Sequence, residues 1–110
     1  MKSLWKLYRC VEELRKIDPE MQAHTINIFL TVCMQPSITM KDLGERLGIQ
    51  QATISRNISL LGNTYNRTSN QGFGLVVATK DPMERRRKVV HLTPKGKRVA
   101  DSILEIMQSP

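Results

Sequence analysis

The chain has 110 residues, of which 40% are hydrophobic and 25% charged, and its formal net charge is +7. This predicts a single domain, residues 1–110, and excludes a low-complexity tail and a membrane span, which needs ~20 consecutive apolar residues. The charged N-terminus and two cysteines without a disulfide framework predict a cytoplasmic protein with no secretory signal.

Basic residues gather in one part of the chain. Residues 80–98 hold eight bases against two acids, and no carboxylate lies between Glu45 and Asp81. A stretch of this length without acidic residues predicts a polyanionic partner, most often nucleic acid. Basic proteins without such a partner are also common, so the charge alone leaves both interpretations open.

Residues 1–35 predict two helices. Leu4, Leu7, Tyr8, Val11 and Leu14 recur at steps of three and four residues. This spacing predicts an amphipathic helix from Ser3 to Ile17. Asp18 and Pro19 predict the start of a second helix, with Asp18 as N-cap and Pro19 at the first helical position. The second helix, to about Met34, is apolar on much of its circumference, so we expect it in the middle of the core.

Residues 37–93 predict a DNA-binding core. Ser37 to Thr39 is a short extended piece, and Met40, Leu43 and Leu47 mark one face of a short helix. Gly48 and Ile49 form a turn, and Ile54, Ile58 and Leu61 line the inner face of a second helix from about Gln50. Two short helices joined by a glycine-containing turn form a helix-turn-helix. The small Gly44 lets the two helices approach each other.

Two β-branched runs follow, from Leu75 to Lys80 and from Lys88 to Thr93, with a basic segment between them. They predict a hairpin, or wing. Thr93 and Pro94 then predict the N-cap and first turn of a last helix over residues 94–110. The predicted fold is therefore mainly α (α+β), a winged helix-turn-helix with flanking N- and C-terminal helices.

The stretch from Ile38 to Gly96 resembles the DNA-binding core of MarR-type transcriptional regulators. DLGERLGIQQATISRNISLL is similar to the helix-turn-helix of that family, and DPMERRRKVVHLTPKG is similar to its wing and the start of its dimer helix. The resemblance implies that Glu84 takes the place of the family's wing acid and contacts Arg86. It also implies that Arg86 enters the minor groove of DNA. Ligand sensing is not carried over, so a small-molecule effector stays unknown.

The second helix of the motif would lie in the major groove. We expect six outward residues there that donate or accept hydrogen bonds and carry no negative charge: Gln50, Gln51, Thr53, Ser55, Arg56 and Asn57. On the wing, Arg85, Arg87 and Lys88 would neutralise phosphates beside Arg86. The alternative is a solvated polar helix and a solvated charged turn.

Further basic and polar residues are weaker candidates for contact with DNA. Lys95, Lys97 and Arg98 lie at the start of the last helix, and Tyr65 and Arg67 lie in a polar link over residues 63–74. A solvated helix start and a loop without a role explain them equally well. We expect Cys10 and Cys33 to be inert thiols, His24 and His91 to be structural, and no metal or cofactor to be bound.

The resemblance also implies that the terminal helices pack against a second chain to form a two-fold homodimer. The expected interface residues are Leu4, Trp5, Tyr8, Val11, Ile103, Leu104 and Met107. Alternatively, the two helices complete the core of one chain.

The sequence therefore favours a homodimeric, sequence-specific regulator that binds double-stranded DNA at an operator. The alternative is a winged-helix module of DNA replication, partition or packaging, or one that docks on a protein such as RNA polymerase. An enzyme is not expected, because no nucleophile–base pair, phosphate-binding loop or metal spacing is present in the sequence.

Overall fold

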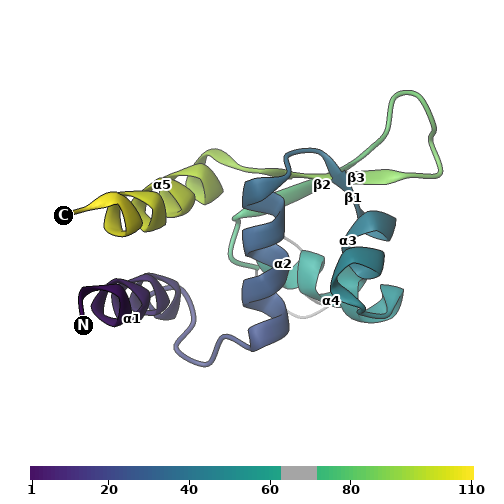
Figure 1. Ribbon diagram of the computed structural model, residues 1–110. Helices are drawn as coiled ribbons and strands as arrows, with labels where there is room; N and C mark the ends of the chain where they lie inside the picture. The colour runs from purple at the N-terminus through teal and green to yellow at the C-terminus, as the bar shows by residue number, and fades with distance from the viewer. Residues whose placement is uncertain (63–71) are drawn as a thin grey trace.

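Five helices and a three-stranded antiparallel sheet make up the computed structural model, which describes residues 1–62 and 72–110 (Figure 1). The terminal helices lie together at one end, and the other elements form a second group. In chain order the elements are α1 (Lys2–Arg15), α2 (Ala23–Met34), β1 (Ile38–Thr39), α3 (Met40–Leu47), α4 (Gln51–Leu61), β2 (Val76–Lys80), β3 (Lys88–Leu92) and α5 (Pro94–Gln108).

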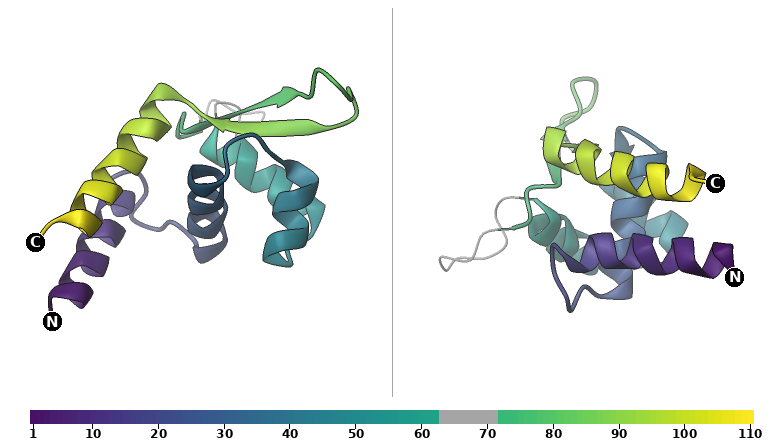
Figure 2. Two further views of the ribbon diagram at one scale, coloured as in Figure 1. Left: turned by 45° about the horizontal axis from the view of Figure 1, so that its top comes forward. Right: turned by 90° about the vertical axis from the view of Figure 1, so that its left-hand side faces the viewer.

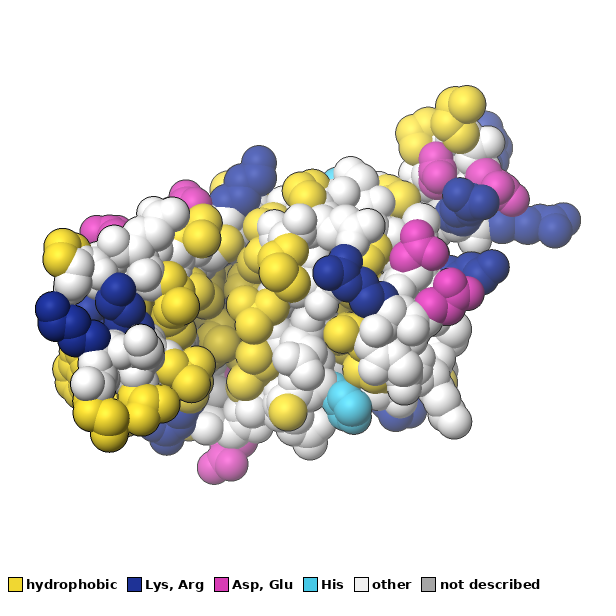
Figure 3. Space-filling view, viewed as in Figure 1, with side chains coloured by type: hydrophobic (Ala, Val, Ile, Leu, Met, Phe, Trp, Pro, Cys, Tyr) yellow, Lys and Arg dark blue, Asp and Glu magenta, His cyan; other side chains and the backbone are white. Residues whose placement is uncertain are grey.

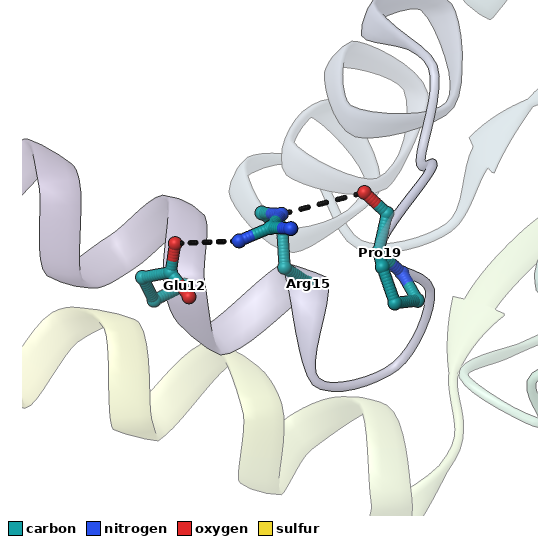
Figure 4. Close-up of polar contacts among 3 residues, drawn as sticks. All are labelled: Glu12, Arg15 and Pro19. Carbon is teal, nitrogen blue, oxygen red and sulfur yellow. Dashed lines mark hydrogen bonds and ion pairs between the residues drawn. The ribbon is translucent and has the colours of Figure 1, made fainter.

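The predicted start of the second helix is wrong, because α2 begins at Ala23 and not at Pro19. The Asp18 carboxylate accepts a hydrogen bond from the backbone N–H of Glu20 at 2.9 Å, which closes a turn instead of capping a helix. Arg15 fixes the same turn, since its guanidinium donates to the Pro19 carbonyl at 3.4 Å and pairs with Glu12 at 2.9 Å (Figure 4).

Helix α2 is the centre of the core, as its apolar circumference predicts. Ile28, Phe29 and Val32 are fully buried, and they join one hydrophobic cluster with residues of α3, α4 and the sheet. Burial of such side chains is the main stabilising contribution to a fold of this size. In the ranges 1–62 and 72–110, no helix has the length and apolarity of a membrane-spanning segment.

The helix-turn-helix forms as the sequence predicts. The Thr39 hydroxyl caps α3 by accepting from the Asp42 N–H at 3.0 Å, and Gly48 ends the helix at a φ of +66°. Glycine is favoured in this left-handed conformation at the end of a helix, because it has no Cβ to clash with the backbone. Gly44 lies against the start of α4, where an added Cβ would be 2.9 Å from the Ile49 carbonyl oxygen.

The wing is the β2–β3 hairpin, with β3 in the middle of the sheet and β1 on its other side. Val90 is fully buried and is paired with Ile38 on one side and Ala78 on the other, so the hairpin is anchored to the core. The loop of residues 81–87 projects away from the body at the upper right (Figure 1). The Asp81 N–H donates to the Arg87 carbonyl at 2.9 Å and closes this loop.

Helix α5 starts as predicted, with Pro94 in its first turn and the Thr93 hydroxyl accepting from the Gly96 N–H at 3.0 Å. It runs antiparallel to α1, so both termini of the chain lie at the same end (Figure 2). Lys6 of α1 donates to the Met107 carbonyl at 3.3 Å.

Candidate nucleic-acid interface

The exposed side of α4 carries most of the predicted base-reading residues. Gln50, Ser55 and Arg56 are exposed, and Thr53 is half-buried. The Arg56 guanidinium donates to the Thr53 hydroxyl at 3.3 Å. The side of the helix that faces away from the core therefore offers hydrogen-bonding groups and one positive charge.

Gln51 is exposed, but its side chain is engaged with α3. The side-chain amide donates to the Met40 carbonyl at 3.2 Å and covers Gly44. This bond connects the first turns of α3 and α4. Gln51 therefore helps to hold α3 and α4 together. It lies at the edge of the outward surface of α4 that was predicted to contact DNA.

The prediction that Asn57 faces outward is wrong. Its side chain is 9% exposed, accepts a hydrogen bond from the Thr25 hydroxyl at 2.6 Å and donates to the Thr53 carbonyl at 2.8 Å. Asn57 follows Ile54 by three residues and precedes Leu61 by four, so it lies on the inner face of α4. The helical spacing predicts this position, although the residue type suggested a surface.

All four basic residues of the wing, Arg85, Arg86, Arg87 and Lys88, are exposed. The expected contact between Glu84 and Arg86 is wrong, because the Glu84 carboxylate pairs with Arg87 at 3.3 Å. The Arg87 N–H also donates to the Glu84 carbonyl at 3.0 Å, so a tight turn brings these two side chains together. Figure 3 shows the basic side chains of the wing beside acidic and apolar ones at its tip.

A groove of about 500 Å³ lies between the start of α3, the outer side of α4 and the wing. Its lining includes Gln51 and Ser55 from α4 together with Arg86, Arg87 and Lys88 from the wing. The helix-turn-helix and the wing therefore face one common groove. Lys41, in the first turn of α3, also lines it and was missed, since nothing in its spacing distinguishes it from an ordinary solvated lysine.

The weaker basic candidates lie elsewhere. Lys95 donates to the Phe73 carbonyl at 2.9 Å and lines a separate cavity of about 210 Å³ with Lys16 and Arg98. Lys97 is exposed on α5. None of the three candidates on α5 lines the groove beside α4. Tyr65 and Arg67 lie outside the described residues.

The cysteines are shielded. Burial raises the pKa of the Cys33 thiol to about 11. It also raises the pKa of Cys10 of α1, whose thiol lies 3.9 Å from the Ile103 carbonyl oxygen of α5. His91 contacts the Ser37 hydroxyl at 3.2 Å, and His24 is exposed. In the part of the chain that the structure describes, no three potential metal ligands come together.

An apolar surface covers the outer side of the terminal helices. Six of the seven expected interface residues are exposed, and Trp5 and Tyr8 are 60% and 55% accessible. The two rings stack at a centroid distance of 5.4 Å. Ile103 is the exception, because it packs against the core of its own chain. The terminal helices thus contribute one face to the core and leave another uncovered.

Solved structures of MarR-type transcriptional regulators share this architecture. A MarR transcriptional regulator from Methanosarcina mazei Go1 superposes with a TM-score of 0.67 at 25% identity, over 96% of this chain and 72% of that chain. A mutant of MarR from E. coli, complexed with operator DNA, gives 0.68 at 18% identity, over 98% and 69%. PcaV from Streptomyces coelicolor, in complex with its natural ligand, gives 0.60 at 24% identity, over 80% and 61%.

The chain thus spans 61% of the PcaV chain and 63% of a MarR chain. No protein-family model and no curated protein matches the sequence. The structural likeness confirms the predicted MarR-type winged helix-turn-helix fold with flanking terminal helices.

Proposed function

We propose that this chain, which has the fold of MarR-type winged-helix regulators, is a sequence-specific transcriptional regulator that binds double-stranded DNA. The observation that carries the proposal is the common groove, in which Gln51 and Ser55 of α4 lie opposite Arg86 of the wing. Such an arrangement lets one duplex contact both elements from one side. MarR of E. coli was solved with operator DNA, which supports the same use of the fold here.

In this proposal the outer side of α4 enters the major groove. The helix has 11 residues, so it is about 16 Å long and, with side chains, about 10–12 Å across, which matches the ~12 Å width of the major groove. Arg56 suits the acceptors of guanine, and a bidentate contact of this kind discriminates between bases by ~1–3 kcal/mol. Thr53, Ser55 and the exposed Gln50 would complete the contact surface.

The wing then reaches the adjacent minor groove. Arg86 makes no ion pair within the described residues, and its charge is available for the negative potential that a narrow A·T-rich groove concentrates. Arg85 and Lys88 would lie against phosphates and release counterions. Arg87 forms an ion pair with Glu84, so we expect it to contribute less to DNA affinity than Arg85, Arg86 and Lys88.

The proposed regulator is a homodimer. The exposed apolar residues of α1 and α5 would be covered by the same surface of a second chain, an isologous contact that suits two-fold symmetry. Stacked aromatic residues such as Trp5 and Tyr8 are typical anchors of interfaces. Two copies of α4 would then meet half-sites about one helical turn apart, ~34 Å.

Selection of genomic fragments by the purified protein tests the proposal. We expect enrichment of a pseudo-palindromic site that outcompetes bulk DNA by at least ~10³, with an affinity that falls steeply as salt increases. Sequencing of the bound fragments also identifies the genes next to the operator. Equal binding to all duplexes, or no binding, would contradict a sequence-specific regulator.

A further inference from the structure

A buried polar contact joins α2 to α4. The Thr25 hydroxyl, in the first turn of α2, donates to the Asn57 side-chain oxygen at 2.6 Å. Thr25 is 1% exposed, and buried apolar residues lie next to the pair along both helices, Ile28 on α2 and Ile54 and Ile58 on α4. A polar pair in such surroundings has no solvent to replace a lost partner, so its geometry is strongly determined.

The contact continues to the surface of α4. The Asn57 amide donates to the Thr53 carbonyl at 2.8 Å, and the Thr53 hydroxyl accepts from Arg56 at 3.3 Å. Four residues therefore connect the first turn of α2 with the guanidinium that α4 presents to the outside. Apolar contacts are non-directional and tolerate a small rotation of one helix against another, whereas a hydrogen bond weakens when its length or angle departs from the preferred range.

We infer that Thr25 and Asn57 are positioning residues that fix the rotation of α4 about its own axis, and thereby set which DNA sequence is selected. The inference rests on the proposed function, because it assigns to the pair the specificity of that DNA contact. A rotation of about 20° moves side-chain ends at a radius of ~5–6 Å by about 2 Å. Hydrogen bonds to base edges, which need 2.7–3.2 Å, are lost by such a shift.

The chain offers a matched control on the same helix. Thr31 is 3% exposed, but its hydroxyl donates to the Asn27 carbonyl of α2 itself at 2.7 Å. Thr25→Val and Thr31→Val therefore make the same chemical change at two buried sites of α2, and only the first removes a contact with α4. Thr25→Ser keeps the hydroxyl and removes the methyl group.

The first measurement is the orientation of α4 relative to α2 in free protein, by residual dipolar couplings of the backbone amides. The second is selection from a random duplex library, with binding to the selected site compared with binding to bulk DNA. Thr25→Val is expected to reorient α4 and to lower the ratio of specific to non-specific affinity by about tenfold. The salt dependence of the affinity of Thr25→Val for bulk DNA is expected to equal that of the wild type. Thr31→Val and Thr25→Ser keep both properties.

A second variant separates positioning from stability. The double substitution Thr25→Val with Asn57→Leu replaces both partners by apolar groups of similar shape, which leaves no buried polar group unpaired. We expect this variant to unfold close to the wild-type temperature and still to lose the selectivity. Recovery of selectivity together with stability would overturn the inference, because the pair would then serve the fold alone.

The remaining outcomes distinguish the inference from the proposed function. An unchanged orientation of α4 in Thr25→Val overturns the inference whatever the DNA data are. A changed orientation with wild-type selectivity, or an equal loss in Thr25→Ser, also overturns it. If wild-type protein selects no sequence while Thr25→Val reorients α4, the proposed function fails and the positioning role stands.

Discussion

Replacement of Arg86 by alanine separates binding from stability. Arg86 is exposed, lines the groove beside α4 and makes no hydrogen bond or ion pair with residues 1–62 or 72–110. Its removal should change the free energy of unfolding by less than ~0.5 kcal/mol, as is usual at such surface positions. Each lost minor-groove contact should weaken operator binding by ~1–3 kcal/mol, which is about 5- to 150-fold in Kd, and a dimer loses two such contacts.

The salt dependence gives a second magnitude. In the minor groove Arg86 would lie among the phosphates of both strands and neutralise about one charge, which contributes ~0.9 to the slope of log K against log salt. One lost contact then reduces the affinity change between 50 and 200 mM salt by about 3.5-fold. A dimer loses two contacts, which raises this factor to about 12-fold. Fluorescence anisotropy at four or five salt concentrations measures the slope, and thermal unfolding measures stability.

Arg15→Ala is the matched control, since it removes the same side chain from α1, at the other end of the molecule (Figure 1). Arg15 makes two exposed contacts, an ion pair with Glu12 worth ~0.2–1 kcal/mol and a long hydrogen bond of 3.4 Å to the Pro19 carbonyl. We therefore expect a small loss of stability and an unchanged salt slope. An Arg86→Ala variant that melts much earlier, or one whose salt slope equals that of the wild type, would contradict a contact between Arg86 and DNA.

Three further changes test other parts of the account. Gly44→Ala should lower the melting temperature, because overpacking against the Ile49 carbonyl and Gln51 costs ~1–3 kcal/mol. This cost outweighs the ~1 kcal/mol that alanine gains over glycine in a helix. A rise in the melting temperature would contradict the close approach of α3 and α4. Trp5→Glu should convert a dimer into monomers in sedimentation experiments and weaken operator binding; an unchanged mass would exclude α1 from the interface. Cys33, with a pKa of about 11, has about a thousandth of its thiol ionised at pH 8, so iodoacetamide should label it far more slowly in native than in urea-unfolded protein. Because the pKa of Cys33 in the folded protein lies above the ordinary 9.0, the protonated thiol contributes to stability fully below pH 9, and this contribution is lost as pH rises towards 11. A free energy of unfolding that does not change between about pH 9 and 11 would contradict the burial of Cys33.

Local signals in the sequence were sufficient for the helix-turn-helix and the wing. Gly48 ends α3 because only glycine adopts its φ of +66° without cost, and Thr93 with Pro94 starts α5 through a cap within three residues. Such signals act between neighbours along the chain. They predict the order of the elements and the side of α4 on which Ile54 and Leu61 lie.

Contacts between distant segments could not be predicted in the same way. Asp18 and Pro19 are equally suited to capping a helix and to closing a turn. In the structure they form a turn, in which the Asp18 carboxylate accepts from the Glu20 N–H and the Pro19 carbonyl accepts from Arg15. Asn57 has a polar side chain, yet its burial depends on Thr25, a residue 32 positions earlier. The pairing of Glu84 with Arg87 depends on the tight wing turn, which the resemblance alone does not specify.

The most direct test of the central claim, that α4 and the wing bind one duplex from one side, is an NMR titration of labelled protein with the selected operator duplex. We predict that the largest shifts occur at Ser55 and Arg56 of α4 and at Arg85 and Arg86 of the wing, and that they saturate together at one dimer per duplex. Amides on the outer side of α1 should not shift. Shifts confined to α1 and α5, or to the wing without α4, would contradict the claim.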